Sequence, residues 1–237
     1  MSILISDLDE PIISFMDLPE IVNLMQTNKN YYEKIKYQTL IKEWNEMKDK
    51  KCTLNEFFWQ ICEQGYITYA KSLFNRYTID IHFHNEKAFG VACTTGHLET
   101  AKWLIYLGEN GDRKINIHYN HDVDFKNTCF NGHLEVAKFM IELGENGYGK
   151  INIHRYEQQS FRSVCQNGHL SIALWLVELG ENGYGKINIH VDDDNVFRLA
   201  CRYKHWNIAT WLIELGKNGY GEIKQEIITA YYLMVST

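Results

Sequence analysis

The sequence predicts an all-α solenoid built from 36-residue units, and three periodic features support this fold class. The tripeptide Gly-His-Leu begins at Gly96, Gly132 and Gly168, so its copies are 36 residues apart. The segment Ile-Asn-Ile-His also recurs, ending each time in a histidine. One phenylalanine and one cysteine of each unit keep the period: Phe89, Phe125, Phe161 and Phe197, with Cys93, Cys129, Cys165 and Cys201. Such self-similarity is typical of stacked repeats, which bury a shared core against their neighbours.

Composition narrows the class of protein further. The 237 residues are 45% hydrophobic and 23% charged, a balance typical of globular chains. The formal net charge of −6 argues against nucleic acid as the main partner. No apolar run reaches the roughly 18 residues that a membrane helix needs, and the first residues carry no basic segment of a secretory signal. We therefore expect no membrane partner and a cytoplasmic location.

The two ends of the chain do not follow the repeat. Residues 1–50 predict a short segment of three helices, in which Pro19 occupies the first turn of a helix. Its apolar side chains recur at the spacing of one helix face: Leu4, Leu8, Ile12 and Phe15. Residues 223–237 are expected to form either an incomplete last unit or a C-terminal cap.

Residues 51–222 hold about five units, and each unit predicts two helices joined by a tight turn. In one unit, the first helix runs from about Phe125 until Gly132 breaks it with a positive φ. The second helix spans 134–143, where an apolar stripe faces the core. Gly144 is expected to end this helix as a left-handed cap.

A glycine-rich loop, Gly-Glu-Asn-Gly-Tyr-Gly-Lys, follows the second helix at 144–150. We expect a flexible connector, because a phosphate-binding loop needs a preceding strand and a Lys-Ser/Thr ending. Tyr148, Tyr184 and Tyr220 lie at equivalent tips, where they either form a row of contacts or stack on one another. Residues 151–153 alternate apolar and polar, which predicts a short extended segment.

The recurring polar residues favour a structural role over catalysis. Cys-x3-His occurs four times, but stacked helices lie about 8–10 Å apart, too far for a disulfide or a four-ligand zinc site. The repeated histidines are expected to hydrogen-bond backbone groups in the turns. The sequence therefore predicts no enzyme, no catalytic or metal-binding residue and no cofactor.

The run Asn-Gly-His-Leu-Glu-Val-Ala-Lys at 131–138, with its apolar stretch and the closing Leu143-Gly144, resembles the ankyrin repeat. Two features differ from that family. Ser-Phe-Arg-Ser at 160–163 stands in place of Thr-Pro-Leu-His, so the hydrogen bonds that begin the helix must be replaced or lost. The enlarged loop lengthens the period from the usual 33 residues to 36. Units of this length resemble ankyrin proteins of giant viruses that infect amoebae, which implies action in the cytosol of a host cell.

The order of residues in 12–32 resembles the F-box, a three-helix module that docks on the adaptor Skp1 and brings a substrate to a cullin ubiquitin ligase. The usual Leu-Pro opening of that family falls on Leu4-Ile5, so its proline is missing here. The alternative is that residues 1–50 only cap the end of the stack. The resemblance implies Skp1 contacts through Leu4, Leu8, Ile12, Phe15, Leu18 and Pro19.

Residues that do not repeat are the candidates for recognition, because the fold does not depend on them. The ankyrin resemblance implies a concave surface made by the segments before each recurring phenylalanine and by the exposed side of the first helices. The expected contacts are Tyr119, Asp122, Asp124, Lys126, Phe130, Arg155, Tyr156, Arg162, Gln166, Asp192, Asp193, Arg198, Arg202 and Tyr203. Neighbouring arginines and aspartates suggest a protein partner of mixed charge.

These observations predict a non-enzymatic adaptor. Its repeats would capture a target protein, and its F-box-like end would recruit the ubiquitin ligase. The alternative is a scaffold or sequestering protein whose N-terminal segment is only a structural cap.

Overall fold

The computed structural model describes residues 53–235, except for the side chains at 120, 156–157 and 231–235. All regular structure in this range is helical, with no strand. None of these helices is both long enough and apolar enough to cross a membrane. The described residues divide into two compact units, one of 53–61 and 68–79 and the other of 62–67 and 80–235. The residues expected to contact Skp1 lie outside the described range.

Most of α4 (Leu54–Glu63) and α5 (Ile67–Arg76) belongs to the first compact unit. A capping box begins α4. The hydroxyl of Thr53 accepts a hydrogen bond from the Glu56 backbone N–H at 3.2 Å, and the Glu56 carboxylate accepts one from the Thr53 N–H at 2.6 Å. These two bonds satisfy backbone donors that have no partner within the helix.

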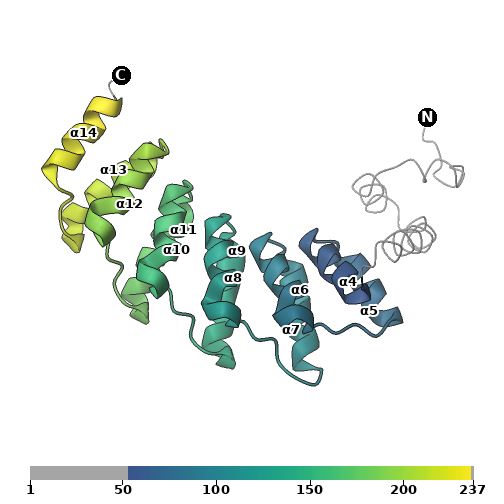
Figure 1. The fold of residues 1–237 in the computed structure, drawn as a ribbon. Helices are drawn as coiled ribbons and strands as arrows, with labels where there is room; N and C mark the ends of the chain where they lie inside the picture. The colour runs from purple at the N-terminus through teal and green to yellow at the C-terminus, as the bar shows by residue number, and fades with distance from the viewer. Residues whose placement is uncertain (1–52, 236–237) are drawn as a thin grey trace, which may run out of the picture. The chain divides into compact units, whose positions relative to one another are not determined.

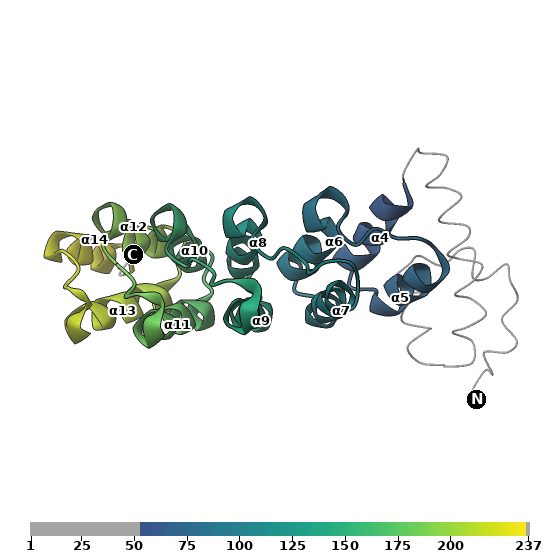
Figure 2. The ribbon, with the colours of Figure 1, turned by 90° about the horizontal axis from the view of Figure 1, so that it is seen from below.

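Four helix pairs and one last helix make up most of the second compact unit. The first helices of the pairs pack side by side in chain order, and each packs on its own second helix. Figures 1 and 2 show the resulting two layers, with α6, α8, α10 and α12 in one and α7, α9, α11 and α13 in the other. The all-α repeat architecture is thereby confirmed. The pairs are α6 (Phe83–Thr94) and α7 (Leu98–Glu109), α8 (Tyr119–Phe130) and α9 (Leu134–Leu143), α10 (Arg155–Gln166) and α11 (Leu170–Leu179), α12 (Val191–Arg202) and α13 (Trp206–Leu215), followed by α14 (Gln225–Val235).

The recurring apolar residues form the core of this unit. Each of the four recurring phenylalanines is at most 1% exposed, which confirms that they face the interior. The ring of Phe125 lies 6.4 Å from that of Trp175, and Phe161 lies 6.3 Å from Trp211, so each contacts the second helix of the following repeat. Ile151 and Ile153 are buried while the residue between them is exposed, which confirms the alternation although no strand forms.

The turn between the helices of a pair has the predicted geometry. Gly96, Gly132 and Gly168 have φ of 84°, 86° and 83°. A side chain at Gly132 would also collide with the next repeat, because a Cβ there would lie 2.7 Å from the imidazole of His169. Lys204 occupies the same place in the last pair with φ of 63°, a conformation that is strained for a residue with a side chain.

The predicted left-handed cap at Gly144 is wrong. Gly144 is right-handed, with φ of −57°, and continues the chain into one π-helical turn, η2 (Gly144–Tyr148). The positive φ values come later, at Gly147 and Gly149. The longer loop has moved the chain reversal away from the last turn of the helix. The same turn recurs as η3 (Gly180–Tyr184) and η4 (Gly216–Tyr220).

These loops bind neighbouring repeats together instead of serving as loose connectors. The hydroxyls of Tyr148 and Tyr184 donate hydrogen bonds to the carboxylates of Glu109 and Glu145 in the preceding repeats, at 2.9 and 3.1 Å. Lys150 lies 4.0 Å from the centre of the Tyr184 ring and donates to a carbonyl of the same loop at 2.8 Å. Each of the three tyrosines is therefore held by a carboxylate at its hydroxyl and by a lysine ammonium near its ring.

Each first helix starts from a left-handed turn. In α12, Asp192, Asp193 and Asp194 have φ of 53°, 58° and 60°, and in α6 the residues at 84–86 have similar values. Left-handed non-glycine residues cost about 1–2 kcal/mol each, so other contacts must stabilise the turn. The regular α-helix begins only after this turn, close to the predicted start near Phe125.

A hydrogen-bonded link to the next repeat provides this stabilisation. Asp122, the last residue of its turn, is buried, and its carboxylate accepts a hydrogen bond from the backbone N–H of Asn152 at 3.3 Å. The other oxygen of Asp122 lies 2.5 Å from Nδ1 of His118, whose Nε2 lies 2.9 Å from the carbonyl oxygen of Tyr148. Glu86, Gln158 and Asp194 make the same backbone bond in the other repeats. The expected bonding of histidines to backbone groups is thereby confirmed.

Candidate partner-binding surface

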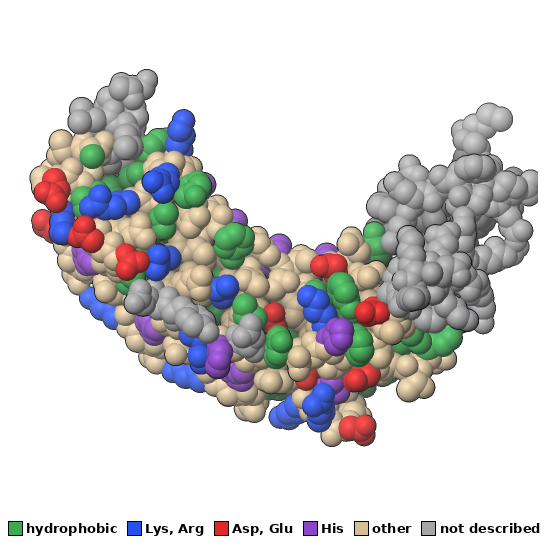
Figure 3. Space-filling view, viewed as in Figure 1, with side chains coloured by type: hydrophobic (Ala, Val, Ile, Leu, Met, Phe, Trp, Pro, Cys, Tyr) green, Lys and Arg blue, Asp and Glu red, His purple; other side chains and the backbone are tan. Residues whose placement is uncertain are grey.

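The exposed side of the first helices carries residues at equivalent positions of successive repeats. Lys126, Arg162 and Arg198 are 36 residues apart, so they form a row of three cations across α8, α10 and α12. Figure 3 shows that basic and hydrophobic side chains lie next to one another on the face in view. Because the chain as a whole carries a net charge of −6, this row is a local departure from its charge balance.

An open hollow of about 470 Å³ runs across these three helices. We call it the α8–α10–α12 groove. Four of the residues expected to bind a partner line it together, and the lining holds no carboxylate among the side chains that the structure describes. Phe130 is the most exposed hydrophobic residue in the lining, with 44% of its surface accessible to solvent. The lining residues are Lys126, Asn127, Phe130, Gln159, Arg162, Ser163, Gln166 and Leu199.

Half of the residues in this lining were not expected from the sequence. Asn127, Ser163 and Leu199 are equivalent positions of three repeats, and they differ from one another as binding residues should. Gln159 lies about one turn before Arg162 on the same face of α10. The sequence does contain one indication of this lining, because Leu199 is apolar at a position that is polar in the two preceding repeats.

A smaller hollow of about 270 Å³ lies between α8 and α10, and Arg155 and Lys126 both line it. Asp122 also reaches it, but only 5% of this residue is exposed, because its carboxylate serves the link to the next repeat. Asp122 therefore has a structural role in this link, and its role as a partner contact stays a prediction. The Arg155 Nε lies 3.8 Å from the Asp122 carboxylate.

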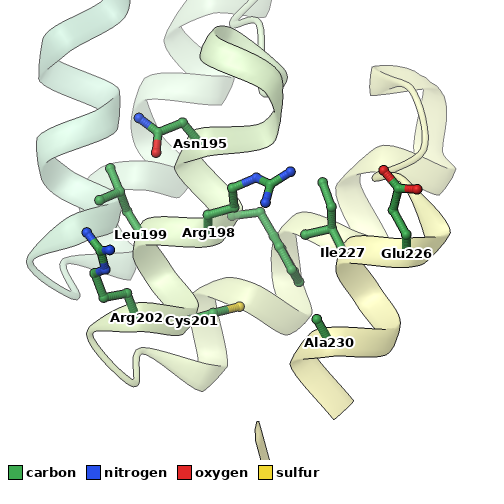
Figure 4. A pocket seen from close by; sticks show the side chains of 9 residues that line it. Asn195, Arg198, Leu199, Cys201, Arg202, Glu226, Ile227 and Ala230 are labelled. Carbon is green, nitrogen blue, oxygen red and sulfur yellow. The ribbon is translucent and has the colours of Figure 1, made fainter. Parts of the chain in front are cut away.

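A third hollow, of about 450 Å³, separates α12 from α14 (Figure 4). Leu199, Ile227 and Ala230 give it apolar walls, and Arg198 and Arg202 bring in positive charge. Glu226 is the acidic side chain in the lining. Arg198 and Arg202 were both expected to contact a partner, and here they share one recess.

The expected acidic contacts are already paired within the surface. Asp192 forms an ion pair with Arg162 at 3.0 Å. Asp193 pairs with Arg198 at 3.3 Å and with Lys224, and the hydrogen bond from Lys224 is the main reason that the pKa of Asp193 lies below its usual value. The aspartates therefore neutralise part of the cationic row.

Asp124 is half-buried and, unlike Asp122 and Asp194, forms no ion pair within 4 Å among the described residues. Its carboxylate lies against Gly90 of α6, where a Cβ would be 2.8 Å from one oxygen. Burial raises the pKa of Asp124 from 3.8 to about 6, and nearby Lys87 opposes this rise. A carboxylate held at this cost beside a binding face is a candidate functional group.

Two expected contacts, Tyr119 and Tyr203, are exposed to solvent, Tyr203 at 49%. The side chain of Tyr156 lies outside the described residues. The five cysteines within the described range are buried and unpaired, and burial raises the pKa of each thiol, that of Cys201 to about 11. In residues 53–235 no three His, Cys, Asp or Glu side chains are arranged to hold a metal ion.

A comparison of the sequence with models of known protein families finds no family that matches, and a comparison with curated proteins finds none that is similar. The surface formed by the first helices therefore has to be interpreted from its own geometry.

Proposed function

We propose that this protein is a non-enzymatic adaptor of the ankyrin type, which binds a target protein through the first helices of its repeats. The proposal rests on one observation: recurring and variable residues have different roles within each repeat. The recurring residues are used in the core and in the links between repeats. The residues that vary, including Lys126, Phe130 and Arg162, line one open groove that spans three repeats. Arginine and aromatic residues are also the types that most often dominate binding energy.

A triple alanine variant at Arg162, Arg198 and Tyr203 tests this function. We expect the full-length variant to lose a partner that the unchanged chain captures from cell extract. We also expect its thermal unfolding to stay nearly the same, because exposed ion pairs contribute only about 0–1 kcal/mol. Alanine at the exposed Lys217, in a loop outside the groove, is the matched control. Equal capture by both variants would refute the assignment of the surface.

The recruiting half of the proposal rests on the F-box-like residues 4–19. We propose that they dock on Skp1, so that a captured target is presented to a ubiquitin ligase. A pull-down of the full chain with Skp1 tests this part, with Leu8→Asp/Ile12→Asp as the variant. If both proteins recover Skp1 equally, or neither recovers it, the alternative remains: a scaffold or sequestering protein whose first 50 residues are a cap.

A further inference from the structure

We propose that the α8–α10–α12 groove binds an extended acidic segment of the partner protein. Carboxylates of the segment would pair with Lys126 and Arg162 in the groove and with Arg198, the residue before Leu199 in α12, and an apolar side chain would pack on Phe130. This inference rests on the proposed function and adds the chemistry of the ligand.

Charge is the first argument for an acidic ligand. Among the described residues, the lining of the groove has two cations, Lys126 and Arg162, and no acidic side chain. The third cation, Arg198, lies outside this lining and is paired with the exposed Asp193. No described carboxylate lies within 4 Å of the Lys126 ammonium. Arg162 is paired with Asp192, but both side chains are partly exposed, and such a pair is worth about 1 kcal/mol or less. A carboxylate of the partner can therefore replace Asp192 at little cost.

Spacing is the second argument. The three cations occupy the same position in successive repeats, so they are separated by the distance between packed helices, about 8–10 Å. A polyproline II segment advances about 9.3 Å in each turn of three residues. Acidic side chains at every third position would therefore meet successive cations from one face of such a segment. A β-strand presents one face at about 7 Å intervals and fits this row less well.

The apolar walls are the third argument, and they favour a peptide over a nucleic acid. Phe130 is strongly exposed in the groove, and Leu199 lies on its far side, in α12. A hydrophobic side chain of the ligand can bury the exposed Phe130, at about 25 cal/mol for each Å² of apolar area removed from water. The net charge of −6 also repels a long polyanion, whereas a short acidic segment contacts only the groove.

Fluorescence anisotropy on the full chain tests the proposal with two labelled peptides of identical composition. One has glutamates at every third position around a single leucine, and its isomer has the same glutamates adjacent. We expect the spaced peptide to bind at least tenfold more tightly, and less tightly as salt is raised. Lys126→Glu/Arg162→Glu should weaken binding at least tenfold, whereas Lys217→Glu should leave it unchanged. Circular dichroism confirms that each variant is folded. Equal binding of the isomer, or equal loss in the control, would overturn the proposal.

Selection from an unbiased peptide display library separates this inference from the proposed function. Enrichment of acidic peptides that depend on Lys126 and Arg162 supports both. Enrichment of neutral or basic peptides that lose binding in Phe130→Ala overturns the acidic ligand but leaves the adaptor function in place. If no selected peptide depends on the groove, both the acidic ligand and the proposed binding surface are contradicted. Binding of labelled polyuridylate that the spaced peptide cannot displace would instead assign the face to nucleic acid.

Discussion

Replacing Asp124 with asparagine should stabilise the protein, and the gain should depend on pH. Burial holds the pKa of this carboxyl near 6 in the folded chain, against 3.8 in its absence. A difference of about two units corresponds to about 3 kcal/mol. An amide of the same shape removes the charge but still loses some hydration, at about 1 kcal/mol. The expected net gain is therefore about 2 kcal/mol above pH 7.

The direction of this pH dependence follows from the difference in proton binding between the folded and unfolded states. Between pH 4 and 6 the folded state holds the Asp124 proton more tightly than the unfolded state does. The stability contributed by this group is therefore present at low pH and falls as the pH rises through that window. Urea unfolding of both proteins from pH 4 to pH 8 measures the difference. Asp112→Asn, at an exposed loop position, is the control and should show no such trend. A difference between Asp124→Asn and the unchanged chain that is zero, or constant with pH, would refute the reasoning.

Three further outcomes follow from the links and turns. His118→Ala should lower the free energy of unfolding by about 1 kcal/mol more than His154→Ala, because the ring of His118 contacts a carboxylate as well as a carbonyl and that of His154 contacts a carbonyl alone, and chemical denaturation measures the difference. Lys204→Gly should raise the free energy of unfolding by about 1 kcal/mol, because it relieves the left-handed strain, and chemical denaturation measures the gain. Iodoacetamide under native conditions should alkylate Cys201, which lines a hollow, well before the fully buried Cys165. The opposite order would contradict the access of solvent to Cys201 through this hollow.

Periodicity was sufficient to predict the fold class, because the residues that make the core repeat. The phenylalanine, the cysteine and the turn glycine each have one role, and that role depends only on neighbours at the same spacing. The left-handed turn was not predictable in this way. Its residues, such as Asp192 and Asp193, have no single composition, and what stabilises them is a hydrogen bond to a backbone amide about 30 residues away.

The candidate site was predictable only in outline. Variable positions identified Lys126 and Arg162, which the groove brings together. The same criterion selected Asp122, because the residue at that position varies between repeats and so was not expected to be required by the fold. In the structure the position accepts Glu, Asp or Gln, all of which offer an oxygen acceptor to the next repeat. Variation among side chains that share one hydrogen-bonding function is a structural signature and not a recognition signature.

The link between repeats has a consequence for how such a chain can evolve. The buried oxygen acceptor and the histidine of one repeat engage main-chain atoms of its successor, and every copy possesses these atoms regardless of its sequence. Any copy can therefore follow any other. Whole repeats can be duplicated or deleted by recombination while the links between neighbours are kept. The number of repeats is then a property that selection can change one repeat at a time.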